Sequence, residues 1–256
     1  MLRVTLRGAV AVVAAAVVLT TAAAPARAWT PDARAAAEYA ESRAGDVAFA
    51  VVHDDGRAWR YRAATSVPTA SVLKVMFMVA YLRLPEVRDR DLRDADRDLL
   101  RPMIRRSDNA TATRIADRVG PRRMDRLADR AGMRDFSYTR PWGASRTSAR
   151  DEAAFMRRVH HRIPRRHRTY AMRLLARIVD DQRWGVGEID LPPGWTAHFK
   201  GGWGSGTGAV DHQVVQLRHR DGRRHGLAVT TTNSPSHDYA TRTLRGVFRR
   251  LLANLG

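Results

Sequence analysis

Only two lysines occur in this sequence, Lys74 and Lys200, although it contains 45 basic residues. Every other basic residue is arginine, as expected from a coding bias that replaces interchangeable lysines. Arginine cannot be deprotonated in a protein, whereas a buried lysine can. The two lysines therefore mark positions where the chemistry needs a proton-accepting amine or a compact ammonium group.

The first lysine closes the motif Ser71-Val72-Leu73-Lys74. At a helix start, the Ser71 hydroxyl would lie in the positive field of the helix N-terminus. Lys74 follows three residues later on the same face, so its amine can approach that hydroxyl. A serine hydroxyl is a poor nucleophile until a neighbouring base takes its proton. The spacing predicts Ser71 as nucleophile with Lys74 beside it, although such a tetrad also occurs often by chance.

A second motif, Ser107-Asp108-Asn109, lies in a helical region. A second hydroxyl could relay a proton to a leaving nitrogen, and an amide could orient the substrate. The same three residue types are also strong helix N-caps, and the following residues continue helically. At this stage the motif is either part of a site or a helix start.

The third motif, Lys200-Gly201-Gly202-Trp203, ends an extended segment. A fixed ammonium group there could steer an acidic group of a substrate, and the glycines would let a ligand lie against the strand backbone. Backbone N–H groups at this point and at Ser71 could form an oxyanion hole. The alternative is a flexible turn, because glycines recur through residues 201–208.

The elements that must position these motifs follow from hydrophobic periodicity and turn residues. The patterns predict a first helix over 30–45, a hairpin over 46–53 and 58–62, and an apolar, buried helix over 72–84. A charged helical region over 89–132 follows, with breaks at Pro102 and Gly120-Pro121, and then a loop over 133–148. The rest is predicted as helices over 149–161 and 169–181, strands over 196–200, 210–219 and 225–232, and a closing helix over 239–252. Trp184-Gly185-Val186-Gly187 is interpreted as a helix exit.

This order predicts an α+β fold with three layers, α/β/α. Both chain ends would form one antiparallel sheet flanked by the terminal helices, with an all-helical lobe inserted. The helical lobe is expected at about residues 72–185, and the α/β lobe at 29–71 plus 186–256.

The N-terminus has the pattern of a Sec-type signal peptide. Arg3 and Arg7 precede an apolar stretch over residues 8–24, and Ala26-Arg27-Ala28 offers a cleavage site. We expect residues 1–28 to be removed, leaving a domain over 29–256 with no stable membrane anchor. The predicted location is extracellular or cell-wall-associated. The chain has no cysteine, which excludes disulfides and cysteine lipidation.

The formal net charge of +19 raises the question of a polyanionic partner. The arginines alternate with aspartates and are not interleaved with aromatic residues, so we expect no nucleic-acid partner. An anionic cell-wall surface is a possible partner. The histidines His160, His161 and His167 lack the spacing of a metal site, and we expect no metal or cofactor.

The three motifs, in this order, resemble the S-x-x-K, S-D-N and K-T-G set of class A β-lactamases and penicillin-binding proteins. The hairpin before Ser71 and the segment Arg146-Thr147-Ser148-Ala149 extend the resemblance. It implies a small β-lactam or peptidoglycan-like substrate. By this resemblance Ser71 would be the acylated nucleophile, Lys74 its activator and Ser107 the proton relay. Lys200 would anchor a carboxylate, and Asn109 would position the substrate. Gly202 and Trp203 would belong to the strand and the oxyanion hole that bind the acyl group.

Two departures from that set bear on function. Gly201 stands where the threonine of K-T-G would help to bind a β-lactam carboxylate. In class A β-lactamases the loop before Arg146 carries a glutamate that activates the deacylating water, and we would expect it near Trp142-Gly143. This loop contains no glutamate, and Glu152 and Glu188 are distant candidates for the same role. Three functions stay open: a slow β-lactam hydrolase, a D-Ala-D-Ala carboxypeptidase, or a non-catalytic penicillin-binding or wall-recognition module.

Overall fold

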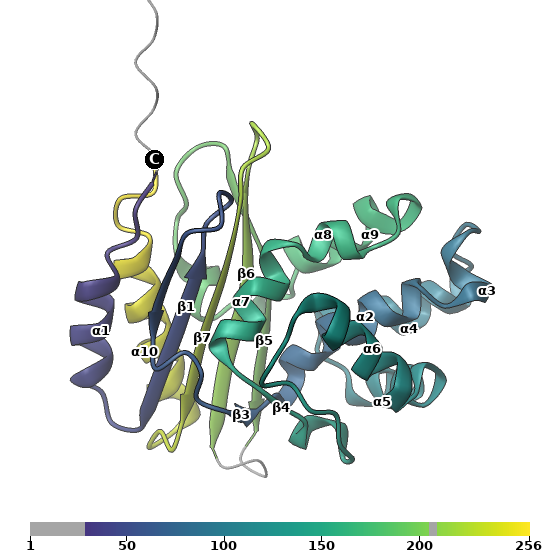
Figure 1. Cartoon of the computed structure of the whole chain (residues 1–256), viewed down its shortest axis with the longest axis horizontal. Coiled ribbons are helices and arrows are strands. Elements are labelled where there is room, and N and C mark those ends of the chain that lie inside the picture. Colours follow the sequence, from purple (N-terminus) through teal and green to yellow (C-terminus); the bar gives the residue numbers. More distant parts are fainter. Residues whose placement is uncertain (1–28, 205–208) are drawn as a thin grey trace, which may run out of the picture.

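Both ends of the chain contribute strands to one antiparallel sheet (Figure 1), as predicted. The computed structural model describes residues 29–204 and 209–256, so the predicted signal peptide lies outside the described residues. The five strands are ordered β2-β1-β7-β6-β5, which leaves β5 at one edge. Their bounds are Asp46–Val52 for β1, Ala58–Tyr61 for β2, Trp195–Gly204 for β5, Val210–His219 for β6 and Arg224–Thr232 for β7.

Two helices from the chain ends form the outer layer on one face of the sheet (Figure 1). Helix α1 spans Ala33–Glu41 and helix α10 spans His237–Leu251. The Asp32 side chain accepts a hydrogen bond from the first turn of α1, and Ser236 does the same for α10. Such caps satisfy backbone donors that a helix start leaves without partners.

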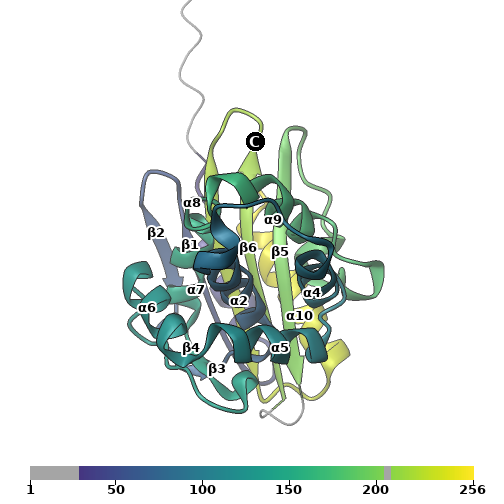
Figure 2. The same ribbon diagram turned by 90° about the vertical axis from the view of Figure 1, so that its right-hand side faces the viewer.

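The third layer is helical and is built around α2, Leu73–Leu82, all of whose side chains are buried. Figure 2 shows α2 in front of the sheet, with other helices around it. A helix that is apolar on every side needs such a central place. The surrounding helices are α3 Pro85–Arg88, α4 Asp94–Arg105, α5 Asn109–Val119, α6 Pro121–Ala131, α7 Ala149–Arg157, α8 Val159–Arg162 and α9 Arg168–Ala176.

Short elements join these layers. Strands β3, Val67–Pro68, and β4, Arg146–Thr147, pair with each other next to the segment that carries Ser71. Five 3-10 helices complete the described chain: η1 Ala70–Val72, η2 Trp142–Ala144, η3 Arg165–His167, η4 Asp180–Gln182 and η5 Gly185–Glu188. No helix within residues 29–204 and 209–256 is long and apolar enough to cross a membrane.

The predicted helix break at Pro102 is wrong, because α4 continues through this proline. The missing backbone donor is tolerated where the next residues, Met103 and Ile104, are fully buried and packing holds the helix. The helix ends at Arg105, and the chain then turns at Ser107, whose φ is +59°. The break predicted at Gly120 is confirmed, and its φ is +71°.

Glu152 is buried where α7 meets the β3–β4 pair. Its carboxyl group accepts a hydrogen bond of 2.9 Å from Thr147 Oγ1. Burial, which disfavours the carboxylate, raises its pKa from 4.5 to about 7. Between these two pH values the folded protein keeps a proton that the unfolded chain has lost.

Glu152 should therefore make the protein less stable as the pH rises from about 4.5 to 7, because a raised folded-state pKa contributes stability that is complete only at low pH. Glu152→Gln keeps the shape and the acceptor, and should remove this dependence. At pH 8 its free energy of unfolding should exceed that of the wild type by on the order of 3 kcal/mol. Urea unfolding at pH 5 and 8 measures both values, with exposed Glu86→Gln as control. An equal pH slope in all three proteins would contradict the assignment.

Candidate active site

Ser71 lies at the junction between the sheet and the helical layer. It belongs to η1, which leads directly into α2, and its side chain is partly exposed while its neighbours Ala70 and Val72 are buried. Ala70 has a φ of +44°, so the backbone turns sharply just before the serine. Ser71 is therefore partly accessible at the start of a buried helix.

The amine of Lys74 is fully buried and held by three contacts. Its Nζ lies 2.5 Å from Ser107 O, 3.2 Å from Ser107 Oγ and 2.7 Å from Asn109 Oδ1. Burial lowers the pKa of Lys74 to about 7, although the charge of Asp108 opposes the shift. Among the described residues no hydrogen bond joins this amine to Ser71, so its role as activator stays a prediction.

The second motif is both a helix cap and part of the site. Asp108 caps α5 by accepting a 2.7 Å hydrogen bond from the backbone N–H of Thr111. Ser107, just before it, adopts a left-handed backbone conformation, and Asn109 begins the helix. This arrangement turns the side chains of Ser107 and Asn109 toward Lys74. The interpretation as a helix start is therefore confirmed, and the roles of Ser107 and Asn109 toward a substrate stay a prediction.

Lys200 completes the arrangement from strand β5. Its Nζ lies 2.9 Å from Ser107 Oγ and 2.5 Å from the carbonyl oxygen of Gly201. Burial, together with the nearby charge of Lys74, lowers its pKa well below the usual value. The Ser107 hydroxyl therefore bridges the only two lysines of the chain. The structure brings together Lys74, Ser107, Asn109 and Lys200, as the motifs predicted.

Gly202 allows the edge strand β5 to pack against η1, the segment that carries Ser71. A Cβ at this position would lie 2.8 Å from the backbone nitrogen of Ser71 and 2.7 Å from that of Val72. Only glycine permits this approach. Trp203 follows and is 51% exposed, with its ring centroid 4.9 Å from that of His237 and the two rings tilted by 36°. The predicted oxyanion hole at Ser71 and Trp203 stays a prediction.

Trp184 is a site residue that the sequence did not reveal. It is not a helix exit, because α9 ends at Ala176; its segment lies against β6, where Gln213 Nε2 donates to Trp184 O at 2.7 Å. A Cβ on Gly201 would lie 2.5 Å from the Trp184 ring. The indole therefore occupies the place of the missing threonine side chain. The glycine in the K-T-G position was the one available signal.

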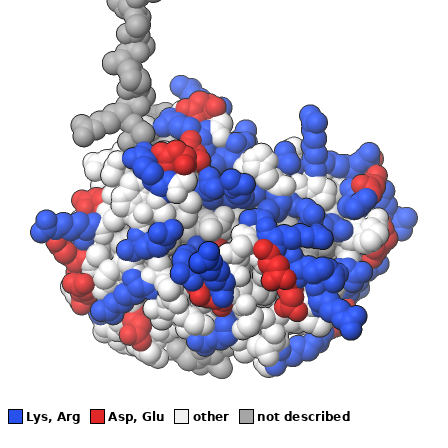
Figure 3. All heavy atoms as spheres, viewed as in Figure 1, with Lys and Arg blue, Asp and Glu red and all other residues white. Residues whose placement is uncertain are grey.

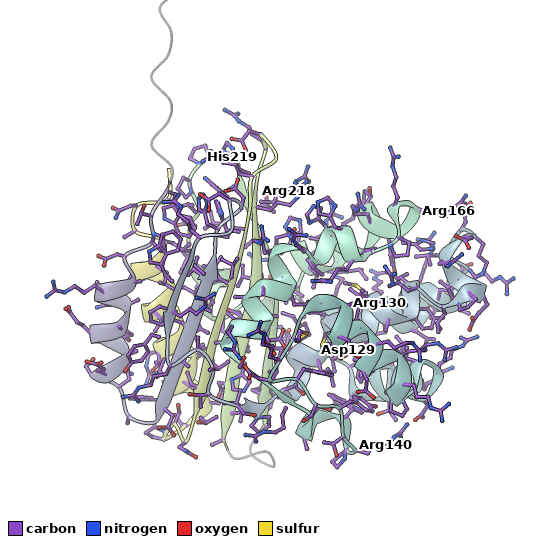
Figure 4. All side chains as sticks on the ribbon, viewed as in Figure 1. Asp129, Arg130, Arg140, Arg166, Arg218 and His219 are labelled. Atoms are coloured by element: carbon purple, nitrogen blue, oxygen red, sulfur yellow. The ribbon has the colours of Figure 1, made fainter. Side chains whose placement is uncertain are left out.

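Trp142, in the loop that lacks a glutamate, places its ring next to Lys74. Its ring centroid lies 5.1 Å from Lys74 Nζ, within cation–π distance, and its Nε1 donates to Thr113 Oγ1 at 3.1 Å. Arg140 of the same loop lies at its outer end (Figure 4) and forms an exposed ion pair with Asp117. The loop thus contributes an aromatic ring to the site.

Neither distant glutamate reaches the site. Glu152 is bonded to Thr147, and Glu188 lies 3.6 Å from Arg245 of α10. In the part of the chain that the structure describes, no carboxylate forms a hydrogen bond with Ser71, Lys74, Ser107 or Lys200. The arrangement can hold and move protons between amines and hydroxyls, but it has no carboxylate positioned to activate water.

Within the described residues 29–204 and 209–256, one group of side chains could hold a metal ion, and it is separate from this site. Ligand atoms of His53, Asp54 and His225 lie within 4.8 Å of one another at the β1–β2 turn. Their lone pairs are partly used, since His225 Nδ1 accepts from Asp54 N at 3.2 Å and His53 Nδ1 lies 2.8 Å from Asp54 Oδ1. This group contributes nothing to the chemistry at Ser71.

Solved structures that share this fold include β-lactamases and PBP-A. A β-lactamase from Sphaerobacter thermophilus superposes with a TM-score of 0.73 at 21% identity, over 86% of this chain and 95% of that one. An ancestral class A β-lactamase gives 0.74 at 17%, over 87% and 99%. A point mutant of PBP-A gives 0.67 at 18%, over 85% and 95%. These likenesses confirm the predicted fold class. A search of curated proteins found no match.

The sequence model of the beta-lactamase enzyme family, Beta-lactamase2, matches residues 94–255, more than half of the chain. The matched part contains Ser107, Asn109 and Lys200. Ser71 and Lys74 precede it, and the structure places Lys74 in contact with the matched residues. The chain belongs to the beta-lactamase enzyme family and is a β-lactamase-like serine hydrolase.

Proposed function

We propose that this protein is a secreted acyl enzyme that attacks β-lactams or related acyl-D-Ala amide bonds through Ser71, and releases the acyl group slowly. The observation that carries the proposal is the buried network in which the Ser107 hydroxyl contacts the amines of Lys74 and Lys200. Buried unpaired amines destabilise a fold, so such a network is expected at a functional site. Secretion is supported by the signal-peptide pattern of residues 1–28.

Acylation uses proton transfers that this network can supply. Ser71 Oγ attacks the carbonyl carbon, and its proton passes to the neutral amine of Lys74. The tetrahedral oxyanion is stabilised by the N–H groups of Ser71 and Trp203. The Ser107 hydroxyl then gives its proton to the leaving nitrogen as the amide bond breaks, and regains one from Lys74. The products are an ester on Ser71 and a neutral amine.

Deacylation has no corresponding base. Hydrolysis of the ester needs a water molecule whose proton is removed, and the loop offers the Trp142 ring next to Lys74. An indole has no basic atom, since its nitrogen only donates. The acyl enzyme is therefore long-lived. The PBP-A relative was itself captured as an acyl-enzyme complex with penicillin G.

A D-Ala-D-Ala peptidase is the second candidate, favoured by one observation. Strand β5 is the edge of the sheet and runs beside η1, so in the described residues no strand pairs with its outer side. Peptides often bind by adding a strand to such an edge. A non-catalytic recognition module is disfavoured, because binding alone would not need two buried lysines.

Protein secreted into the medium, mixed with a chromogenic cephalosporin, should give a stoichiometric burst of colour. Its intact mass should correspond to a chain that starts at Trp29 and carries one acyl group on Ser71. Ser71→Ala should lose both burst and adduct, whereas Ser42→Ala, a matched change at the end of α1, should keep them. Continuous fast turnover would contradict slow release. No adduct with any β-lactam or D-Ala-D-Ala ester would refute the acyl-enzyme proposal.

The acylation rate constant should rise with pH through about 7, because the Lys74 amine must be neutral to accept the Ser71 proton and its pKa is about 7. Below pH 7 the rate should fall about tenfold per pH unit, and above it should level off. Lys74→Arg should lose about 100-fold or more at all pH values, since arginine stays protonated. Stopped-flow fluorescence between pH 5 and 9 gives the profile. A flat wild-type profile would assign the base to another group.

Restoring the K-T-G hydroxyl should help only if Trp184 is removed as well. Gly201→Thr alone should acylate no faster with penicillin G, because its Cβ would collide with the indole. Gly201→Thr combined with Trp184→Ala should acylate about tenfold faster than Trp184→Ala alone, the value of one hydrogen bond to a charged group. Faster acylation by Gly201→Thr alone would mean that Trp184 is not the obstacle.

A further inference from the structure

A polar cavity lies between the sheet and helices α8 and α9. Its volume is about 340 Å³, and none of the site residues described above lines it. Helices α8 and α9 contribute His160 and Arg168, and strands β5, β6 and β7 contribute His198, Gln216, Arg218 and Arg224. Figure 4 places Arg218 near the end of β6, beside these helices.

The cavity concentrates positive charge without a counterion. Its nine lining residues include four arginines and no carboxylate. Arg218 and Arg224 are direct partners across β6 and β7, an arrangement of like charges that destabilises a sheet. Within residues 29–204 and 209–256, none of the four arginines forms an ion pair. On the face that Figure 3 shows, acidic side chains lie among the arginines, although the basic ones predominate.

Five polar atoms of residues that line this cavity are buried and have no partner: His160 Nε2, His198 Nδ1, Gln216 Oε1, and the Nε atoms of Arg168 and Arg224. The side chains of His160, His198 and Gln216 are at least nine-tenths buried. Gln216 Nε2 donates to the carbonyl oxygens of Met156 and Arg157 and lies 3.2 Å from His160 Nδ1, so the hydrogen of His160 is on the unpartnered Nε2. The wall of the cavity therefore contains donors without partners and, at Gln216 Oε1, an acceptor without one. Buried polar groups normally have partners, so an occupant is implied.

We propose that this cavity binds a hydrogen-phosphate group, either as inorganic phosphate or as a phosphate monoester. Arginine side chains match the oxygens of phosphate in charge and geometry. A bound anion would also relieve the repulsion between Arg218 and Arg224. The Gln216 Oε1 acceptor selects hydrogen phosphate over sulfate, because only the former carries an O–H to donate at neutral pH.

The ligand would join the two layers of the molecule. Arg168 begins α9, whereas Arg218 and Arg224 belong to the sheet, so an anion between them links the helical layer to the strands. Ligand binding to the folded state raises the melting temperature by mass action. Phosphate is therefore expected to stabilise this chain, separately from any reaction at Ser71.

Calorimetric titration of the purified chain with inorganic phosphate, methyl phosphate and sulfate at constant ionic strength tests the proposal. One phosphate should bind per chain, and the melting temperature should rise by roughly 5 °C at a hundredfold excess over Kd. Arg218→Gln with Arg224→Gln should weaken binding at least tenfold. Arg249→Gln, an exposed change on α10, should leave it unaltered. Binding of methyl phosphate would identify a monoester site, and its exclusion a site for free phosphate.

A second readout separates the ligand site from a structural role. In phosphate-free buffer Arg218→Gln should raise the melting temperature, because it removes the like-charge pair, and the same variant should lose the rise caused by phosphate. Equal responses to sulfate and phosphate, equal binding by the double variant, or no saturable binding would each overturn the proposal. Acylation of Ser71 should be the same with and without phosphate.

Discussion

The burial of two lysine amines around one serine hydroxyl is the constraint on which the site depends. Lys74 comes from the central helix, Ser107 from the turn between α4 and α5, and Lys200 from the edge strand. Moving ammonium groups out of water costs more than their hydrogen bonds return, and the two amines also repel each other. The fold must therefore hold the helical layer firmly against the sheet. The same burial gives Lys74 an amine that can accept a proton near neutral pH.

Much of this arrangement could be predicted from the sequence, because its signals are local or compositional. The scarcity of lysine singled out Lys74 and Lys200 before any motif was considered. The apolar run after Ser71 predicted a buried helix, and the Asp-Gly hairpin predicted the first strand pair. Asp108 shows how one motif can have two local meanings: it caps α5, and by doing so fixes Ser107 and Asn109 beside the lysines.

The features that could not be predicted depend on contacts between distant segments. Pro102 has a local preference for ending a helix, but the buried packing of α4 overrides it. Trp184 reaches Gly201 only because Gln213, on another strand, holds its backbone. Trp142 reaches Lys74 only because its loop folds back against η1. Sequence patterns describe the periodicity of one element, and they contain no information on which indole will cover which backbone.

The two departures, at the K-T-G threonine and at the loop glutamate, are of the same kind. In each case an indole stands where the pattern would place a polar group: Trp184 over Gly201, and Trp142 beside Lys74. A site that had simply lost its function would be expected to lose its buried amines first, since they are its most destabilising part. Here both amines remain buried, and the Trp142 ring lies 5.1 Å from the amine of Lys74. Burial lowers the pKa of Lys74, which favours acylation in the proposed mechanism, and the indole beside it offers no base for deacylation. The buried amine and the Trp142 ring therefore account for both halves of the proposed behaviour, ready attack and slow release.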